Sequence, residues 1–267
     1  MKLKVIISLI IVLLISWWII IWYINQSQLY DKQKNTTLSG EIKNTIQTLY
    51  PEAITITGDT KQQLIKHTKN IMSEITSLLS IKPIEIKRWS CDEENAFYNP
   101  ETKDITFCDE MINTLISYGK ESWNNETEKT EIALHSSLFI LLHEVGHALI
   151  DILQLPITGK EEDVADQIAT YLIIELNKDN TYNRIMDGAF AFYRFGEQNP
   201  EIDEWVLADA HSLDKQRFYN IACRLYWATQ DQNIISERWL PSERAEGCED
   251  EYNLMKSSLD TLLWRTP

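Results

Sequence analysis

Two histidines four residues apart constrain this chain more than any other feature of its sequence. His143 and His147 lie in the segment HEVGHALIDIL, whose apolar residues recur with the period of a helix. Four residues on a helix turn through about 400°, so the two imidazoles project within about 40° of each other and one turn apart. The spacing predicts a helix on which both rings can bind one metal ion.

Glu144 stands at the position of the general base in a His-Glu-x-x-His site. It lies one step round the helix from His143, where it can accept a proton from a metal-bound water without being a ligand. A catalytic zinc usually has three protein ligands and one open position. The extension H-x-x-G-x-x-H is absent, because Ile150 and Leu153 stand where it needs glycine and histidine. The third ligand must therefore come from another segment.

The next helix supplies the candidate for the third ligand. Helices are expected over 131–155, ending before Pro156, and over 161–177, with the short loop PITGK between them. If the second helix packs antiparallel to the first, its first turn returns to the histidines. An acidic helix N-terminus stabilised only by the helix dipole is the alternative interpretation.

Four acidic residues begin this second helix, and the antiparallel packing gives them different roles. Glu162 is predicted as the third metal ligand. Asp166 lies on the same helix face and is predicted to accept the far ring N–H of a ligand histidine, which fixes its orientation. Glu161 and Asp163 are expected to point elsewhere.

The segment HEVGHALIDILQLPITGKEEDVADQIA resembles the gluzincin type of zinc peptidase, in which H-E-x-x-H is followed by E-x-x-x-D. It is most similar to a bacterial family of putative metallopeptidases catalogued as a domain of unknown function. The resemblance extends over roughly residues 84–252, through CDEENAFYNPETKDITFCDEM, ADAHSLDKQRFYNIACRLYWA and LPSERAEGCEDEY. It implies a zincin fold, one zinc ion (Zn2+) per chain held by His143, His147 and Glu162, and Glu144 as general base. It implies no particular substrate.

His211, in the segment DAHS, lies where a gluzincin often carries a residue that donates to the tetrahedral oxyanion. We therefore nominate it as a catalytic residue, although a histidine that caps or fills a helix junction explains it equally well. Arg217 and Tyr219 are rivals for the same role, and each is more often a packing or surface residue. His135 is two turns from His143, too distant to be a ligand, and is expected in the core.

The remaining sequence predicts an α+β fold, with a small sheet, an active-site helix and a mainly helical C-terminal part. The segments IEIKRWS and ITFC read as strands, the second preceded by the turn signal NPETKD. ITFC is expected at the sheet edge, where an extended peptide could pair, and 95–98 in a partner strand or its turn. Further helices are expected over 62–79, 182–195, 214–229 and 244–264.

A stretch of 20 residues without charge, Val5–Ile24, follows the N-terminal MKLK. At about 1.5 Å per residue it spans roughly 30 Å, the thickness of the hydrocarbon core of a membrane. It is longer than the apolar part of a cleaved signal peptide and lacks a cleavage site. We expect a transmembrane signal anchor over 1–24 with a cytoplasmic N-terminus, a polar spacer over 25–60, and the metallopeptidase domain over 61–267.

Charge and cysteines narrow the possible partners and the compartment. The chain has a net charge of −15, which argues against binding to nucleic acid. The expected topology places all four cysteines in an exported, oxidising compartment, periplasmic or extracellular. Two disulfides are expected, with the local pairings Cys91–Cys108 and Cys223–Cys248 favoured. A zinc ribbon is disfavoured because no C-x-x-C pair occurs.

These features together predict a membrane-anchored, zinc-dependent peptidase that hydrolyses the peptide bonds of a peptide or protein substrate with a zinc-activated water. A zinc-stabilised peptide-binding or scaffold domain without turnover, in the cell envelope, is the alternative from another class. A disulfide-held envelope protein in which the histidine motif is accidental is a third interpretation, and it predicts no tightly bound metal.

Overall fold

The computed structural model describes residues 69, 73, 75–77, 79, 81–122, 126–176, 181–198 and 201–263. It divides the chain into two units, Met1–Asn44 and Thr45–Pro267, and all described residues belong to the second. The expected membrane anchor, the spacer and most of the helix expected over 62–79 lie outside the described residues, and the domain boundaries remain predictions.

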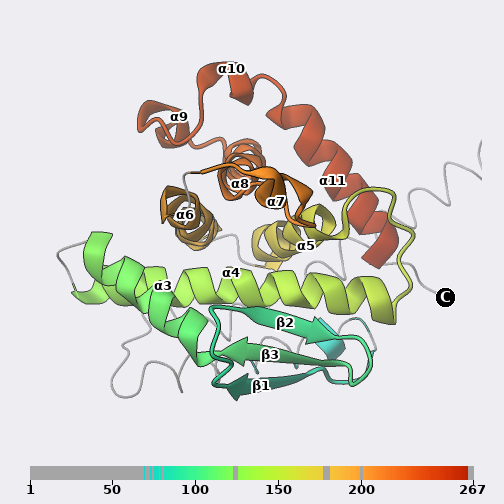
Figure 1. Ribbon diagram of the computed structural model, residues 1–267. Coiled ribbons are helices and arrows are strands. Elements are labelled where there is room, and N and C mark those ends of the chain that lie inside the picture. Colours follow the sequence, from blue (N-terminus) through green and yellow to red (C-terminus); the bar gives the residue numbers. More distant parts are fainter. Residues whose placement is uncertain are drawn as a thin grey trace, which may run out of the picture. The chain divides into compact units, whose positions relative to one another are not determined.

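A small mixed sheet forms the first layer of the described fold (Figure 1). Its strands are β1 (Glu85–Trp89), β2 (Ala96–Asn99) and β3 (Asp104–Cys108). Their order is β1-β3-β2, with β1 parallel and β2 antiparallel to β3. The turn signal NPETKD connects β2 to β3, where the Asn99 side chain accepts hydrogen bonds from the backbone N–H groups of Glu101 and Thr102.

The expectation that ITFC forms the sheet edge is wrong. This segment lies in β3, which pairs with a strand on each side and therefore has no free edge. The edge that faces the helices belongs to β2, which contacts the long helix α4 (Glu126–Ile152). The four-residue β2 is the partner strand expected around 95–98.

Helix α4 lies between the sheet and the helices that follow α4 in the chain (Figure 1). It packs on β2 and β3, and on α3 (Asp109–Ser122), α5 (Glu161–Leu176) and α6 (Thr181–Gln198). Within the described residues, only its segment Glu131–Ile152 is long and apolar enough to cross a membrane. Of the apolar 18-residue stretch in this segment, 94% is buried in the protein. The helix is apolar because neighbours cover it on several sides.

The C-terminal part is helical, as the sequence predicts. Helix α8 (Asp214–Thr229) matches the expected range and packs on α5 and α6. The helix expected over 244–264 is instead two helices, α10 (Ser242–Ala245) and α11 (Cys248–Leu263). The short helices α7 (Glu204–Ala208) and α9 (Asn233–Ser236), and the amphipathic α3, were not predicted.

Both favoured cysteine pairings are confirmed. Cys91 is bonded to Cys108 at the end of β3, and Cys223 of α8 is bonded to Cys248 at the start of α11. The described part of the chain contains no free cysteine. Two disulfides indicate an oxidising, extracytoplasmic location.

Candidate metal centre and active site

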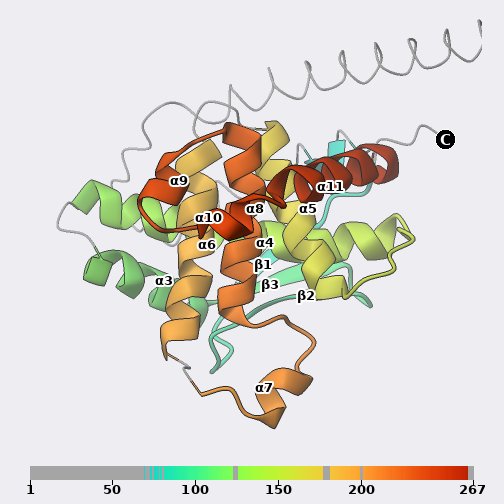
Figure 2. The same cartoon turned by 90° about the horizontal axis from the view of Figure 1, so that it is seen from above.

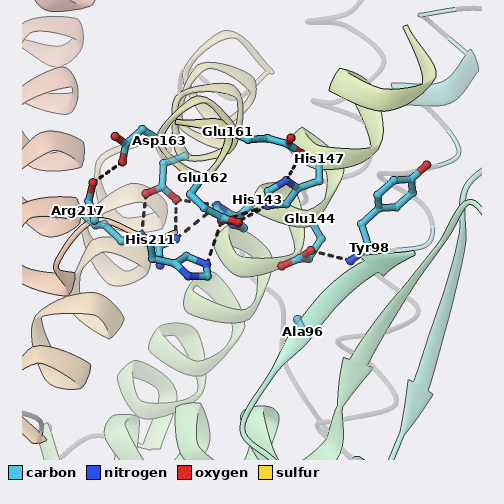
Figure 3. A network of polar contacts seen from close by, with 12 residues as sticks. Ala96, Tyr98, His143, Glu144, His147, Glu161, Glu162, Asp163, His211 and Arg217 are labelled. Atoms are coloured by element: carbon cyan, nitrogen blue, oxygen red, sulfur yellow. Dashed lines mark hydrogen bonds and ion pairs between the residues drawn. The ribbon is translucent and has the colours of Figure 1, made fainter. Parts of the chain in front are cut away.

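The site is built where α4 and α5 cross. His147 of α4 contacts Glu162 near the start of α5, while His143, one turn earlier in α4, contacts Asp166, one turn later in α5. The two helices therefore run antiparallel, as predicted. Figure 3 shows the side chains of His143, His147 and Glu162 pointing toward one another.

Three potential ligand atoms meet at this crossing. The Nε2 atoms of His143 and His147 lie 3.2 Å apart, and Oε2 of Glu162 lies 3.0 Å from the first and 3.2 Å from the second. His143 is buried, and His147 and Glu162 are partly buried. The group could hold a metal ion.

The geometry and chemistry of this group fit zinc. Two imidazole nitrogens and one carboxylate oxygen are a common zinc ligand set, with bonds of about 2.0–2.2 Å. A tetrahedron with such bonds has edges of about 3.3–3.6 Å, a few tenths of an ångström longer than the observed separations of 3.0–3.2 Å. One ion could therefore be held by all three atoms after a small adjustment of the side chains.

The buried ion pair Asp166–Arg217 contacts His143 at Nδ1, the ring nitrogen that faces away from Glu162. Oδ1 of Asp166 lies 2.8 Å from Nδ1 of His143. Arg217 of α8 donates from Nε and Nη2 to the two oxygens of Asp166, at 2.8 and 2.9 Å. Its guanidinium group also lies 3.9 Å from the ring centroid of Phe192. Burial opposes ionisation of Asp166, but Arg217 outweighs it and lowers the pKa of Asp166.

Glu161 was expected to point away from the site, but it points toward it. Its Oε1 lies 2.8 Å from Nδ1 of His147, the ring nitrogen that faces away from Glu162. Each histidine thus has one carboxylate at Nδ1 and shares Glu162 at Nε2. Such outer carboxylates fix the tautomer and raise the basicity of ligand histidines. Asp163 does point elsewhere, and accepts a hydrogen bond from Ser212.

Glu144 links the helix to the sheet. Its Oε2 accepts a hydrogen bond of 2.8 Å from the backbone N–H of Tyr98 in β2 (Figure 3). The side chain is buried, and this burial raises the pKa of Glu144. A raised pKa brings the carboxylate closer to the range in which a general base operates near neutral pH. The sequence indicated Glu144 but not its contact with β2.

His211 belongs to the site, whereas Tyr219 does not. Nε2 of His211 lies 2.9 Å from Oε2 of Glu162, and its Nδ1 lies 2.9 Å from Asp209. The contact with Glu162 raises the pKa of His211. Tyr219 lines a different hollow with Ser212 and Arg244. His135 is buried in the core beside Asp187, as expected.

A cleft of about 1220 Å³ surrounds these residues. Its lining combines apolar and polar side chains. The apolar ones include Met111, Ile140, Phe192 and Phe195 of α3, α4 and α6. The polar ones include Asp151, Gln154, Lys160 and Glu161, which follow His147 in the chain. Ala96, Phe97 and Tyr98 of β2 also line the cleft, so it extends from the ligand group to this strand.

The protein thus has an α+β fold and a cleft in which His143, His147 and Glu162 could hold a metal ion. The model of the family DUF4344, described as "Putative metallopeptidase", matches residues 56–263. The chain therefore belongs to this metallopeptidase family. No curated protein and no solved structure matches the chain.

Proposed function

We propose that the protein is a zinc-dependent peptidase with a zincin-like fold, in which His143, His147 and Glu162 hold the ion. The carrying observation is the meeting of these three ligand atoms at 3.0–3.2 Å, beside the buried Glu144, in a cleft bordered by a strand edge. A bound zinc ion supplies Lewis acidity, which lowers the pKa of a water molecule and polarises the scissile carbonyl.

Proton transfer in this proposal belongs to Glu144. Its carboxylate, held by the Tyr98 N–H, takes a proton from the attacking water and later passes it to the leaving amine. His211, beside Glu162, is placed to donate a hydrogen bond to the developing oxyanion.

The edge of β2 is the proposed platform for the substrate backbone. Ala96 and Tyr98 both line the cleft. Their N–H groups already donate to the side chains of Asn95 and Glu144, so pairing with a substrate would use the carbonyl groups of this edge. An extended peptide that pairs with this edge lies beside the ligand group, and main-chain pairing gives affinity with little sequence preference.

Arg217 and Asp166 act as positioning residues in this proposal. Their bidentate contact holds Asp166 against Nδ1 of His143, so Nε2 stays directed at the ion. Membrane anchoring by Val5–Ile24 and a domain outside the cytoplasm are parts of the same proposal, supported by the sequence of that segment and by the two disulfides.

The test compares wild type with Glu144→Gln on a library of quenched fluorescent peptides, with zinc content measured in parallel. The glutamine carbonyl can still accept from Tyr98, so the variant should fold and keep its zinc. It should lose at least about 100-fold in kcat/KM, the usual contribution of a general base. A zinc-loaded wild type that cleaves no peptide would instead support the scaffold alternative.

A further inference from the structure

A cluster of exposed apolar side chains precedes a cleft-lining segment in the chain and has no role in the chemistry proposed above. Among the described residues, seven large apolar side chains are exposed, and four of them fall between 202 and 207. They are Ile202, Trp205, Val206 and Leu207, with Trp205 84% exposed. We name these four residues the α7 patch. So dense an apolar cluster on a protein surface indicates a binding site.

The α7 patch has a defined conformation although no described part of the chain buries it. Asp203 caps the N-terminus of α7 by accepting a hydrogen bond from the Val206 N–H, and the Leu207 N–H donates to the Asp203 carbonyl. None of the residues in α7 is buried. Figure 2 shows α7 lying apart from the other helices. The apolar side chains are therefore not explained by packing within the described part of the chain.

The segment that follows α7 connects the patch to the cleft. Ala210 and His211 line the cleft two to three residues after α7 ends. His211 is held by Glu162 and Asp209, and the next residue, Ser212, donates to Asp163. The α7 patch is therefore joined to the lining of the cleft by only a few residues of chain.

Charge distinguishes between the possible occupants of the patch. Residues 201–209, EIDEWVLAD, contain four acidic residues and no lysine or arginine. Glu201 and Glu204 are exposed beside the apolar side chains. Such a surface repels anionic lipid, and two copies of it repel each other. It complements a polypeptide that carries large apolar and basic side chains.

We propose that the α7 patch binds an apolar, basic segment of the polypeptide substrate, outside the part held in the cleft. This inference rests on the proposed peptidase function and narrows its substrate class. Trp205 is the principal contact, because a large aromatic side chain buries the most area on binding.

The experiment uses two labelled synthetic peptides of equal length with the same central sequence. One flank alternates leucine and lysine in the first peptide, and serine and glutamate in the second. Their affinities for the zinc-loaded, full-length Glu144→Gln protein are measured by fluorescence anisotropy. We expect only the leucine–lysine peptide to bind tightly, and Trp205→Ala with Leu207→Ser to weaken it by about tenfold or more. Trp89→Ala is the matched control, since Trp89 is 72% exposed on β1 and should have no effect.

Equal binding of both peptides, or binding unchanged by the α7 substitutions, overturns the inference. Patch-dependent sedimentation with vesicles, or a patch-dependent dimer in analytical ultracentrifugation, without peptide binding overturns it in favour of a lipid or a second copy. If patch-dependent binding occurs but wild type cleaves neither peptide, the binding site stands and the peptidase proposal fails. If cleavage occurs with no dependence on the patch, the peptidase stands and this inference fails.

Discussion

Gly146 of α4 and Ala165 of α5 touch so closely that no side chain fits between the two helices at this point. A Cβ atom added to Gly146 would lie 2.7 Å from Cα and 3.0 Å from the carbonyl oxygen of Ala165. Because these are backbone atoms, the added methyl group must push the helices apart. The glycine inside the His-Glu-x-x-His segment therefore sets how closely Glu162 approaches the two histidines.

We predict that Gly146→Ala lowers the free energy of unfolding by about 1–3 kcal/mol, the usual cost of overpacking, and weakens zinc binding. Denaturant unfolding and a zinc competition assay measure the two effects. Gly159→Ala is the matched control, because a Cβ there meets nothing within 4 Å. A Gly146→Ala variant with wild-type zinc affinity would show that the helix spacing does not govern the site.

The buried pair Asp166–Arg217 offers a second prediction. Both side chains are under 10% exposed, so removing one partner leaves an uncompensated charge in the protein interior. Arg217→Met and Asp166→Leu should each cost about 3–5 kcal/mol of unfolding free energy. The double variant should cost less than the sum of the two, because neither charge then remains unpaired. Additive losses in this double-mutant cycle would contradict the pairing.

A third prediction concerns protons in the metal-free protein. Burial opposes protonation of His147, but its hydrogen bonds with Glu162 and Glu161 prevail and raise its pKa to about 9. Burial also opposes protonation of His143, and contacts with Asp166 and Glu162 again raise the pKa. Zinc needs neutral imidazoles, so zinc binding at pH 7 should release at least the proton of His147. Calorimetric titrations in buffers of different ionisation enthalpy count the protons released, and a release near zero would contradict the prediction.

The same pKa shifts determine how the stability of the metal-free protein depends on pH. The folded-state pKa of His147, about 9, exceeds its ordinary value of 6.5. The stabilisation that the folded protein gains from protonated His147 is complete below about pH 6.5 and is lost as the pH rises through about 9. The metal-free protein should therefore become less stable across this window, while its zinc affinity rises. Thermal unfolding followed from pH 6 to 9, with and without zinc, tests the opposite trends.

The disulfide between Cys223 and Cys248 joins α8, which carries Arg217, to α11. It spans 25 residues, and closing a loop of that length in the unfolded chain is worth about 3.5 kcal/mol. The Cys223→Ala/Cys248→Ala variant should lose stability of this order in denaturant unfolding. Wild type in reductant should lose more than this variant, because the Cys91–Cys108 disulfide is reduced as well. Unchanged unfolding after complete reduction would contradict the prediction.

The sequence predicted the centre of the site better than its surroundings, for a physical reason. His143, His147, Glu162 and Asp166 lie on two consecutive helices joined by a short loop, so helical periodicity and chain reversal suffice to bring them together. The contact of Glu161 with His147 was missed because it depends on where the second ring nitrogen points, which residue spacing does not reveal.

Contacts between distant segments were less accessible to sequence reasoning. Strand β2 has only four residues, too few for a periodic pattern, and strand order depends on pairing across the whole sheet; ITFC was therefore placed at the wrong position. Arg217 is 51 residues from Asp166, and a buried arginine looks the same in sequence as one on the surface. The exposed α7 likewise lacks the apolar periodicity of a packed helix.

The central claim is that His143, His147 and Glu162 together hold one zinc ion. The most direct test is the zinc content of the purified protein after mild chelation, compared by elemental analysis with Glu162→Ala and Glu161→Ala. We predict one zinc per chain in wild type, loss of most of it in Glu162→Ala, and a smaller loss in Glu161→Ala. The smaller loss is expected because Glu161 contacts only the outer nitrogen, Nδ1, of His147. A folded wild type without zinc, or Glu162→Ala with zinc bound as tightly as in wild type, would contradict the claim.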